Sequence, residues 1–181
     1  AYWEAFVSLY ATGTFAGTRV VMSADAVSDV GSGMLYVSSS GIAGVRITNS
    51  LGTIDISSGT SVKDDTFHHI AFAKRGPTGG TIELYVNGSI AGSGDLKNDY
   101  PISAATRTGR LASMLGGDEF YGVIDEAHAI KGPNSTDIPT ASEIANRAVR
   151  YDGGTQTTTL STAINASRRI VPSAAGSAIV R

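Results

Sequence analysis

Residues 67–92 of the sequence read FHHIAFAKRGPTGGTIELYVNGSIAG, and this stretch decides the fold class. In 67–74, Ile70 and Phe72 alternate with Ala71 and Ala73, so both faces of an extended strand carry apolar side chains. A strand with two apolar faces is typical of a sheet that is covered on both sides. The segment therefore predicts a strand that lies between two packed layers.

The second half of this stretch predicts a hairpin. The turn formers at 76–80 separate the first strand from 81–86, in which every second residue is apolar. Asn87 and Gly88 follow directly, and both residue types tolerate a positive φ. Because Asn-Gly between alternating apolar residues is the strongest two-residue hairpin signal, we expect antiparallel pairing across this turn.

Outward from the hairpin, the chain up to residue 130 is a series of short segments rich in β-branched and aromatic residues. Clusters of Gly, Ser, Thr, Asn and Asp separate them, as is typical of strands joined by turns. We expect the strand at 54–56 to end at the turn formers 57–59. The other predicted strands are 2–10, 20–22, 34–38, 44–48, 106–111 and 120–130.

One helix is predicted, after residue 139. Thr140 can cap its start, and Glu143 stands at the third helical position, which is the capping-box pattern. Ile144, Ala148 and Val149 would share an apolar face. We expect the helix to end near the turn formers at 152–154.

Composition excludes several classes of protein. The chain has 181 residues and no Cys, which excludes a disulfide framework, an iron–sulfur cluster and a cysteine nucleophile. A net charge of −2 argues against nucleic-acid binding, and no apolar run is long enough to cross a membrane. A secretory signal peptide is not recognisable and the first residue is not Met, as expected of a chain that was processed or cut from a longer one.

These patterns together predict an all-β protein. We expect an antiparallel β-sandwich of about 12 to 14 strands with one short helix near the C-terminus. Residues 1–152 would form this single domain. Residues 153–181, rich in Thr, Ser and Ala, would form a C-terminal extension, either as edge strands or as an arm that packs on a neighbouring subunit.

Three motifs, at 67–72, 82–88 and 120–126, resemble the laminin-G-like group of the concanavalin A-like lectin/glucanase superfamily. In that group an aromatic-His-His strand, a Leu-Tyr-Val-Asn-Gly hairpin and a Gly-x-Ile-Asp-Glu strand recur in this order. Here Phe67 stands where the group usually has Trp, and Ala127 and His128 stand where an Arg-aromatic pair is usual. The resemblance covers residues 2–152 and implies a concanavalin A-like jelly roll. Relatives of this kind include lectins, adhesion modules, pentraxins and phage structural proteins.

The sequence predicts no enzyme site. His68 and His69 point to opposite faces of a strand, so they cannot chelate one metal ion, and we expect a structural role. Asp125 and Glu126 diverge for the same reason, and we expect them to orient loops or to join a buried hydrogen-bond network.

The glucan-cleaving relatives use the pattern E-x-D-x-x-E. With Asp125 as the central acid, Val123 and His128 occupy the positions of both glutamates, and the sequence therefore predicts no catalysis.

A calcium site is one candidate for binding. Calcium takes six to eight oxygen ligands, which loops supply from carboxylates and carbonyls. In pentraxins and laminin-G-like relatives, acids from loops at comparable places meet on one rim. The resemblance places Asp25, Asp29, Asp118 and Glu119 there by position, and the alternative is that they are solvated loop acids.

A sugar site is the second candidate. Lectins combine an aromatic side chain with amide and carboxylate groups, because a sugar has apolar faces ringed by hydroxyl groups. Asp95, Asn98, Asp99 and Tyr100 lie close together in a predicted loop and offer these groups. Trp3, in an early strand, is expected in the core or in an interface.

Two functions remain open. The first is a non-catalytic recognition module that binds carbohydrate or another cell-surface ligand through loops at one rim, with calcium as its candidate cofactor. The second is a structural component of a larger assembly, such as a phage or virion decoration or tail protein, which would bind no small-molecule ligand. Either function is expected outside the cell or on a virion surface, without nucleic acid or membrane insertion, and homo-oligomers are compatible with both.

Overall fold

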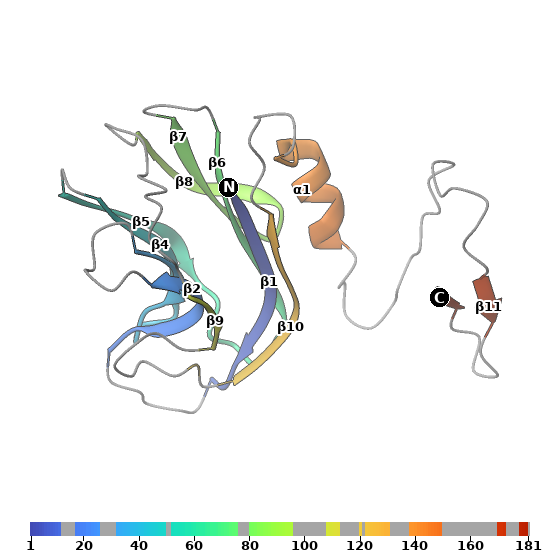
Figure 1. Ribbon diagram of the computed structural model, residues 1–181. Coiled ribbons are helices and arrows are strands. Elements are labelled where there is room, and N and C mark those ends of the chain that lie inside the picture. Colours follow the sequence, from blue (N-terminus) through green and yellow to red (C-terminus); the bar gives the residue numbers. More distant parts are fainter. Residues whose placement is uncertain are drawn as a thin grey trace.

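The chain folds as two antiparallel five-stranded β-sheets packed face to face, with one helix against the outside of one sheet (Figure 1). The computed structural model describes residues 1–11, 17–25, 32–49, 52–75, 80–95, 108–112, 120, 122–130, 138–149, 170–172 and 178–180. The strands of the two sheets are β1 (Tyr2–Leu9), β2 (Arg19–Asp25), β3 (Gly33–Val37), β4 (Ile42–Asn49), β5 (Gly52–Ser61), β6 (His68–Lys74), β7 (Thr81–Val86), β8 (Ser89–Asp95), β9 (Thr108–Leu111) and β10 (Gly122–Ile130). The predicted all-β sandwich is confirmed.

The strand order explains why β6 is apolar on both faces. Sheet A has the order β10-β1-β6-β7-β8, and sheet B has the order β5-β4-β3-β2-β9. β6 is therefore the central strand of sheet A. Its Ile70 and Phe72 pack in the core between the sheets, while Ala71 and Ala73 pack on the opposite face under the helix. The prediction that both faces are covered is confirmed.

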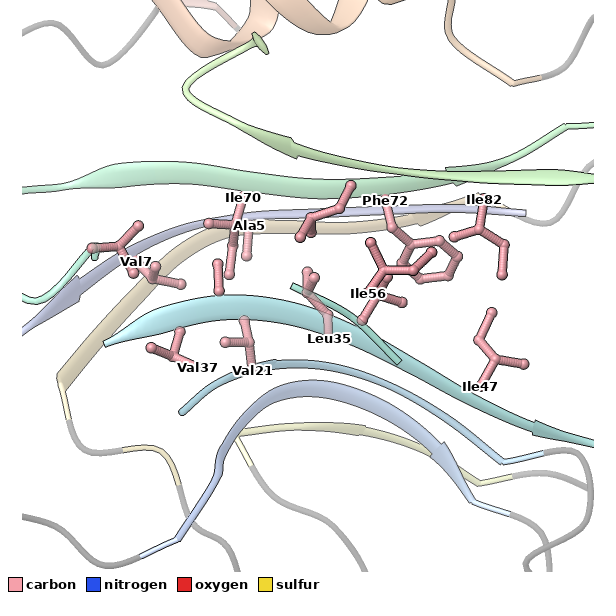
Figure 2. Close-up of a cluster of buried hydrophobic side chains, with 14 of the residues drawn as sticks. Ala5, Val7, Val21, Leu35, Val37, Ile47, Ile56, Ile70, Phe72 and Ile82 are labelled. Carbon is pink, nitrogen blue, oxygen red and sulfur yellow. The ribbon is translucent and has the colours of Figure 1, made fainter. Parts of the chain in front are cut away.

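The core lies between the sheets, where inward-facing side chains of both sheets meet (Figure 2). Trp3 packs at its margin, with its ring 4.9 Å from the ring of Phe72 in an edge-to-face arrangement. Burial of such apolar side chains supplies most of the free energy that holds a sandwich together. The buried members of this cluster are Ala5, Val7, Leu9, Val21, Leu35, Val37, Ala43, Val45, Ile47, Ile56, Val62, Ile70, Phe72, Ile82 and Leu84.

Two glycines bring the sheets close together along one edge. Gly92 and Gly94 of β8 face β5, and a Cβ atom on Gly92 would lie 2.8 Å from the Ile56 side chain. A side chain at either position would force the two edge strands apart. This edge of the sandwich is closed because β8 carries hydrogen atoms where other strands carry side chains.

The β7–β8 hairpin turns at Asn87 and Gly88, as the sequence predicts. Their φ values are 49° and 79°, the left-handed conformation that a two-residue hairpin turn requires. Gly88 also packs against the helix, because a Cβ atom there would lie 2.8 Å from the Cα atom of Ala145. The same glycine thus permits the turn and the docking of the helix.

The helix α1 (Ala141–Ala148) begins at the predicted cap. The Thr140 hydroxyl accepts from the Glu143 backbone N–H at 3.2 Å, and a Glu143 carboxylate oxygen accepts from the Thr140 N–H at 2.7 Å. Ile144 is fully buried against sheet A, but Val149 is 65% exposed. The helix ends at Ala148, so Val149 serves as the C-terminal cap and turns away from the apolar face that the sequence assigned to it.

Strand β5 is longer than the sequence predicts. The turn formers at 57–59 were expected to end it, but the strand continues to Ser61, which pairs with Ile42 of β4. Ser58 points inward and is buried, and its hydroxyl donates to the Thr60 carbonyl oxygen at 2.9 Å. Pairing with β4 overrides the local turn preference, because the neighbouring strand supplies partners for the backbone groups.

Near the C-terminus, β11 (Ile170–Pro172) pairs antiparallel with β12 (Ala178–Val180) as a separate two-stranded sheet. Neither strand belongs to sheet A or sheet B. The predicted boundary at residue 152 lies outside the described residues and stays a prediction. Within the described ranges, no helix has the length and apolar character needed to cross a membrane.

Candidate functional site

The two sheets bring predicted site residues to one end of the sandwich. Asp25 closes β2 beside Thr108, and Asp95 closes β8 beside Thr81. β8 runs antiparallel to β5 along the closed edge, where Gly94 faces Ile54 near the start of β5. The ends of β2 and β8 and the starts of β3, β5 and β9 therefore lie together, at what we call the Asp95 end.

Asp95 is the one member of the predicted sugar site that the structure describes. It is exposed, and its Oδ1 atom accepts a weak hydrogen bond from the Thr81 hydroxyl at 3.3 Å. One carboxylate oxygen has no partner in the part of the chain that the structure describes, so it is available to a ligand hydroxyl. The other predicted members, Asn98, Asp99 and Tyr100, lie outside the described residues.

The predicted calcium ligands are placed only in part. The backbone of Asp25 lies at the Asp95 end, whereas Asp29, Asp118 and Glu119 lie outside the described residues. Among the residues that are described, no group of three or more His, Asp or Glu side chains could hold a metal ion. The calcium site stays a prediction.

The described residues that flank the 113–119 segment lie away from the Asp95 end. Ala112 donates its backbone N–H to the Val21 carbonyl oxygen at 2.8 Å, and Phe120 donates to the Ala112 carbonyl oxygen at 2.8 Å. Val21 precedes Asp25 by four residues of an extended strand, which is about 13 Å. The flanks of the two acidic segments therefore lie at different ends of the β2–β9 pair.

A buried carboxylate organises the outer face of sheet A. Glu4 accepts hydrogen bonds from the Tyr2 hydroxyl at 2.6 Å, from His69 Nε2 at 3.0 Å and from Arg147 Nη1 of α1 at 2.5 Å. Burial alone would raise the pKa of Glu4, but the hydrogen bonds from His69 and Tyr2 and the charge of Arg147 outweigh it and lower the pKa to about 2. Glu4 is thus a buried anion that anchors the helix to the sheet.

The two adjacent histidines serve different parts of the fold. His69 is 1% exposed, bonds Glu4 and lies against the Phe6 ring at a centroid distance of 5.0 Å. His68 points to the other face, where its Nε2 atom lies 2.8 Å from Asp64 Oδ1. As predicted from strand geometry, the two rings cannot bind one metal ion.

His68 is fixed in a single tautomer. The Asn87 side-chain oxygen accepts from the His69 backbone N–H at 3.0 Å, which orients the amide so that its nitrogen donates to His68 Nδ1 at 3.0 Å. His68 therefore carries its hydrogen on Nε2 and donates it to Asp64. Thr66 donates to the same oxygen of Asp64 at 2.7 Å. This cluster joins the residues before β6 to the hairpin turn.

A second set of charged and polar residues connects the start of the helix to sheet A. Arg75 Nε donates to Glu83 at 2.8 Å, and its Nη2 atom donates to the Pro139 carbonyl oxygen at 2.6 Å, just before α1. The Tyr85 hydroxyl donates to Glu83 at 2.7 Å. Sequence analysis missed this group; the signal was the placement of Glu83 and Tyr85 on one face of an alternating strand.

Sequence analysis also missed an exposed polar group on the outside of sheet B. Arg46 of β4 and Asp55 of β5 are directly paired and form a salt bridge, with Arg46 Nε 2.8 Å from Asp55 Oδ2. The Tyr36 hydroxyl donates to the other carboxylate oxygen, and the Arg46 guanidinium lies 5.5 Å from the Tyr36 ring centroid. The signal was the alternation of polar and apolar residues in 53–57, where the outward positions are Thr53, Asp55 and Ser57.

A family profile described as the concanavalin A-like lectin/glucanases superfamily matches residues 4–137. The chain belongs to this superfamily. The predicted resemblance is therefore confirmed over most of the sandwich. None of the curated protein sequences compared with the chain matches it.

Solved structures share the superfamily fold with this chain. The CBM40 domain of the Ruminococcus gnavus IT-sialidase has a TM-score of 0.63 at 11% identity, with 81% of each chain covered. The same domain bound to α2,3-sialyllactose has a TM-score of 0.60 at 10% identity, again with 81% of each chain covered. A heptameric SAP-like pentraxin from Limulus polyphemus has a TM-score of 0.55 at 18% identity, over 81% of this chain and 68% of that one.

The superfamily includes glucanases, and β10 carries two adjacent acids, Asp125 and Glu126. Asp125 and Glu126 are exposed, so the expected buried hydrogen-bond network is wrong, and a role in orienting loops stays a prediction. Glu126 has a φ of 46°, and its backbone N–H donates to Asp125 Oδ1 at 2.8 Å. Asp125 pairs with Phe6 and His128 pairs with Glu4, so Glu126 and Ala127 together face Ala5 in a β-bulge.

Proposed function

We propose that this chain is a non-catalytic recognition module that binds carbohydrate through loops at the Asp95 end of the sandwich. The observation that carries the proposal is that β2 and β8, from different sheets, finish at the same end with Asp25 and Asp95. The loops that continue from these two strands therefore begin at the same end of the sandwich, and binding residues of β-sandwiches commonly lie on such loops. Membership of a superfamily named for lectins supports the proposal.

The proposed sugar site consists of Asp95, Asn98, Asp99 and Tyr100. Among the described residues, one carboxylate oxygen of Asp95 has no partner, and the other three residues follow within the next five positions of the sequence. Carboxylate and amide groups would bond sugar hydroxyls, and the Tyr ring would pack on an apolar sugar face. The structurally similar CBM40 domain is described as bound to sialyllactose, which supports a glycan as the ligand class.

Calcium is the proposed cofactor of this end. Asp25 and Asp29 would supply carboxylate oxygens from the end of β2 and the segment after it, and Asp118 and Glu119 complete the proposed set. The described flanks of the 113–119 segment, Ala112 and Phe120, lie beside Val21, about 13 Å along β2 from Asp25. A loss of binding on removal of calcium would therefore be assigned first to Asp25 and Asp29.

The test is a glycan-array screen of the purified chain, once with calcium and once with EDTA. Binding in calcium alone would support the acidic ligand set, and binding in both conditions would support the Asp95 site without metal. Asp95→Asn should lower the affinity for a bound glycan about tenfold, which is the loss expected when one charged hydrogen-bond acceptor is removed. Glu126→Gln, on the bulge of β10, is the matched control and should bind normally. If the chain binds no glycan in either condition, the proposal is overturned.

A second candidate function is a structural role in an extracellular or virion assembly. The observation that favours it is the β11–β12 sheet, which contains only two strands of three residues each. An isolated hairpin of this size is marginally stable in water, so a neighbouring surface would stabilise it. If the chain assembles through this segment, light scattering should show an oligomer that a chain ending at residue 152 does not form. Equal masses for the two chains would contradict this role.

A further inference from the structure

The outer face of the β4–β5 pair carries an exposed ion pair that is held in one geometry. Arg46 and Asp55 expose 42% and 37% of their side chains, yet both have fixed partners. Tyr36 donates to Asp55 and lies under the Arg46 guanidinium. The Tyr36 ring fills the space above Gly44, where any side chain would collide with it. The ion pair is thus preorganised by its surroundings.

Part of the hydrogen-bonding capacity of this pair is unused. Arg46 donates to Asp55 through Nε and Nη2, so the two N–H groups of Nη1 have no partner in the part of the chain that the structure describes. Asp55 Oδ2 accepts from both Nε and Nη2 of Arg46, whereas Oδ1 accepts only from the Tyr36 hydroxyl and retains a lone pair. A free donor therefore lies beside a free acceptor on an open surface.

This arrangement distinguishes between classes of ligand. The charges of Arg46 and Asp55 cancel, so an anionic ligand would have to compete with Asp55 for the guanidinium. A pair of adjacent hydroxyl groups matches the site without competition. One hydroxyl donates to Asp55, and its neighbour accepts from Arg46 Nη1.

Further polar groups continue along the same two strands. The Thr48 and Thr53 hydroxyls lie 3.1 Å apart and form the next outward pair, two residues from the ion pair. Ser57 is exposed two residues away in the other direction. Consecutive outward positions of a strand are about 7 Å apart, so the row presents hydroxyl partners at regular intervals. A chain of sugar units can contact such a row at several points.

We propose that the outer face of β4 and β5 binds an uncharged polysaccharide, with Arg46 and Asp55 bonding adjacent hydroxyl groups of one sugar unit. The inference rests on the proposed function, that the chain binds glycans, and adds a second surface, which lies on the outer face of sheet B. Thr48, Thr53 and Ser57 would bond neighbouring units of the same polysaccharide.

The test is affinity gel electrophoresis of the full chain in gels that contain galactomannan, xyloglucan or the acidic polymer polygalacturonate. Galactomannan, xyloglucan or both should retard the wild-type chain, and polygalacturonate should not. Arg46→Gln and Asp55→Asn should each lower the affinity for the retarding polymer at least tenfold, because each removes one half of the donor–acceptor pair. Both substitutions alter an exposed pair, so the thermal midpoint should shift by no more than about 3 °C.

The controls separate this inference from the proposed function. Glu126→Gln makes the same change of acid to amide on the other sheet and should bind like the wild type. If a neutral polymer retards the Arg46 and Asp55 variants as strongly as the wild type, the chain binds glycans elsewhere and only this inference is overturned. Retardation by polygalacturonate alone would overturn it too, because the ligand would then be an anion. If no polymer retards the chain and the glycan array is silent, both proposals fail.

Discussion

Glu4 is a buried carboxylate that joins two strands and the helix. Its side chain is 4% exposed and is shared by Tyr2, His69 and Arg147, which come from two strands and the helix. A buried carboxylate is costly unless it is hydrogen-bonded and paired with a cation. The three donors surround Glu4 only when β1, β6 and α1 are in place. The stability of the buried carboxylate therefore depends on the packing of all three elements.

Glu4→Gln should lower the free energy of unfolding by about 2 to 3 kcal/mol. The amide is nearly the same size, but it leaves the Arg147 charge without its partner and places an NH₂ group among three donors. Urea unfolding followed by circular dichroism measures this loss. Glu126→Gln, an exposed residue, should change the free energy by less than about 0.5 kcal/mol. Equal unfolding midpoints for the two variants would show that the buried carboxylate does not stabilise the fold.

Among the elements, α1 depends on local and long-range interactions in comparable measure. Its start is set within four residues by the capping box of Thr140 and Glu143. Its position on the sheet is set by buried Ile144 and by Arg147, which reaches Glu4 across 143 residues of sequence. A helix of two turns is too short to be stable alone, so the contacts with sheet A are required for it to form.

Thr140→Ala should destabilise the chain by about 1 kcal/mol, because the substitution leaves the Glu143 backbone N–H without its side-chain acceptor. Ser142→Ala is a matched control on the exposed face of the same helix and should be neutral or slightly stabilising. Thermal unfolding of both variants, at equal concentration, measures the difference. A midpoint for Thr140→Ala at or above that of Ser142→Ala would show that the cap contributes nothing.

The whole molecule should be most stable above about pH 4.5 and lose stability in acid. Hydrogen bonds and nearby cations hold the pKa of Asp64, Glu83 and Glu143 below their ordinary values, and the pKa of Glu4 falls from 4.5 to about 2. Between about pH 4.5 and pH 2, the unfolded chain therefore binds more protons than the native chain. The free energy of unfolding decreases as the pH falls through this interval. Glu4 alone accounts for roughly 3 kcal/mol of this decrease.

Urea unfolding at several pH values between about 7 and 2 measures the decrease. The Glu4→Gln variant should show a smaller decrease between about pH 4.5 and pH 2, because it lacks the carboxyl group with the lowest pKa. If the wild type and this variant lose the same free energy over that interval, Glu4 is not the acid-sensitive group of the fold.

The amino-acid sequence by itself determined the fold class, most strand positions, the hairpin turn and the start of the helix. Each of these depends on residues within a few positions of one another: the alternation in 67–74, the Asn87-Gly88 turn, and the Thr140–Glu143 box. Local backbone preferences and side-chain periodicity act over this range, so a pattern in the sequence is enough to predict them.

The tertiary structure decided which distant residues became partners. Strand order and the elements that pack on each face decided three features. These are the ion pair of Glu4 with Arg147, the hydrogen bond from Arg75 to the Pro139 carbonyl oxygen, and the extension of β5 to Ser61. Sequence patterns indicated only that such residues lie on one face of an element. Their partners follow from long-range packing of the two sheets and the helix, because a buried charge or backbone group is stable only beside the group that satisfies it.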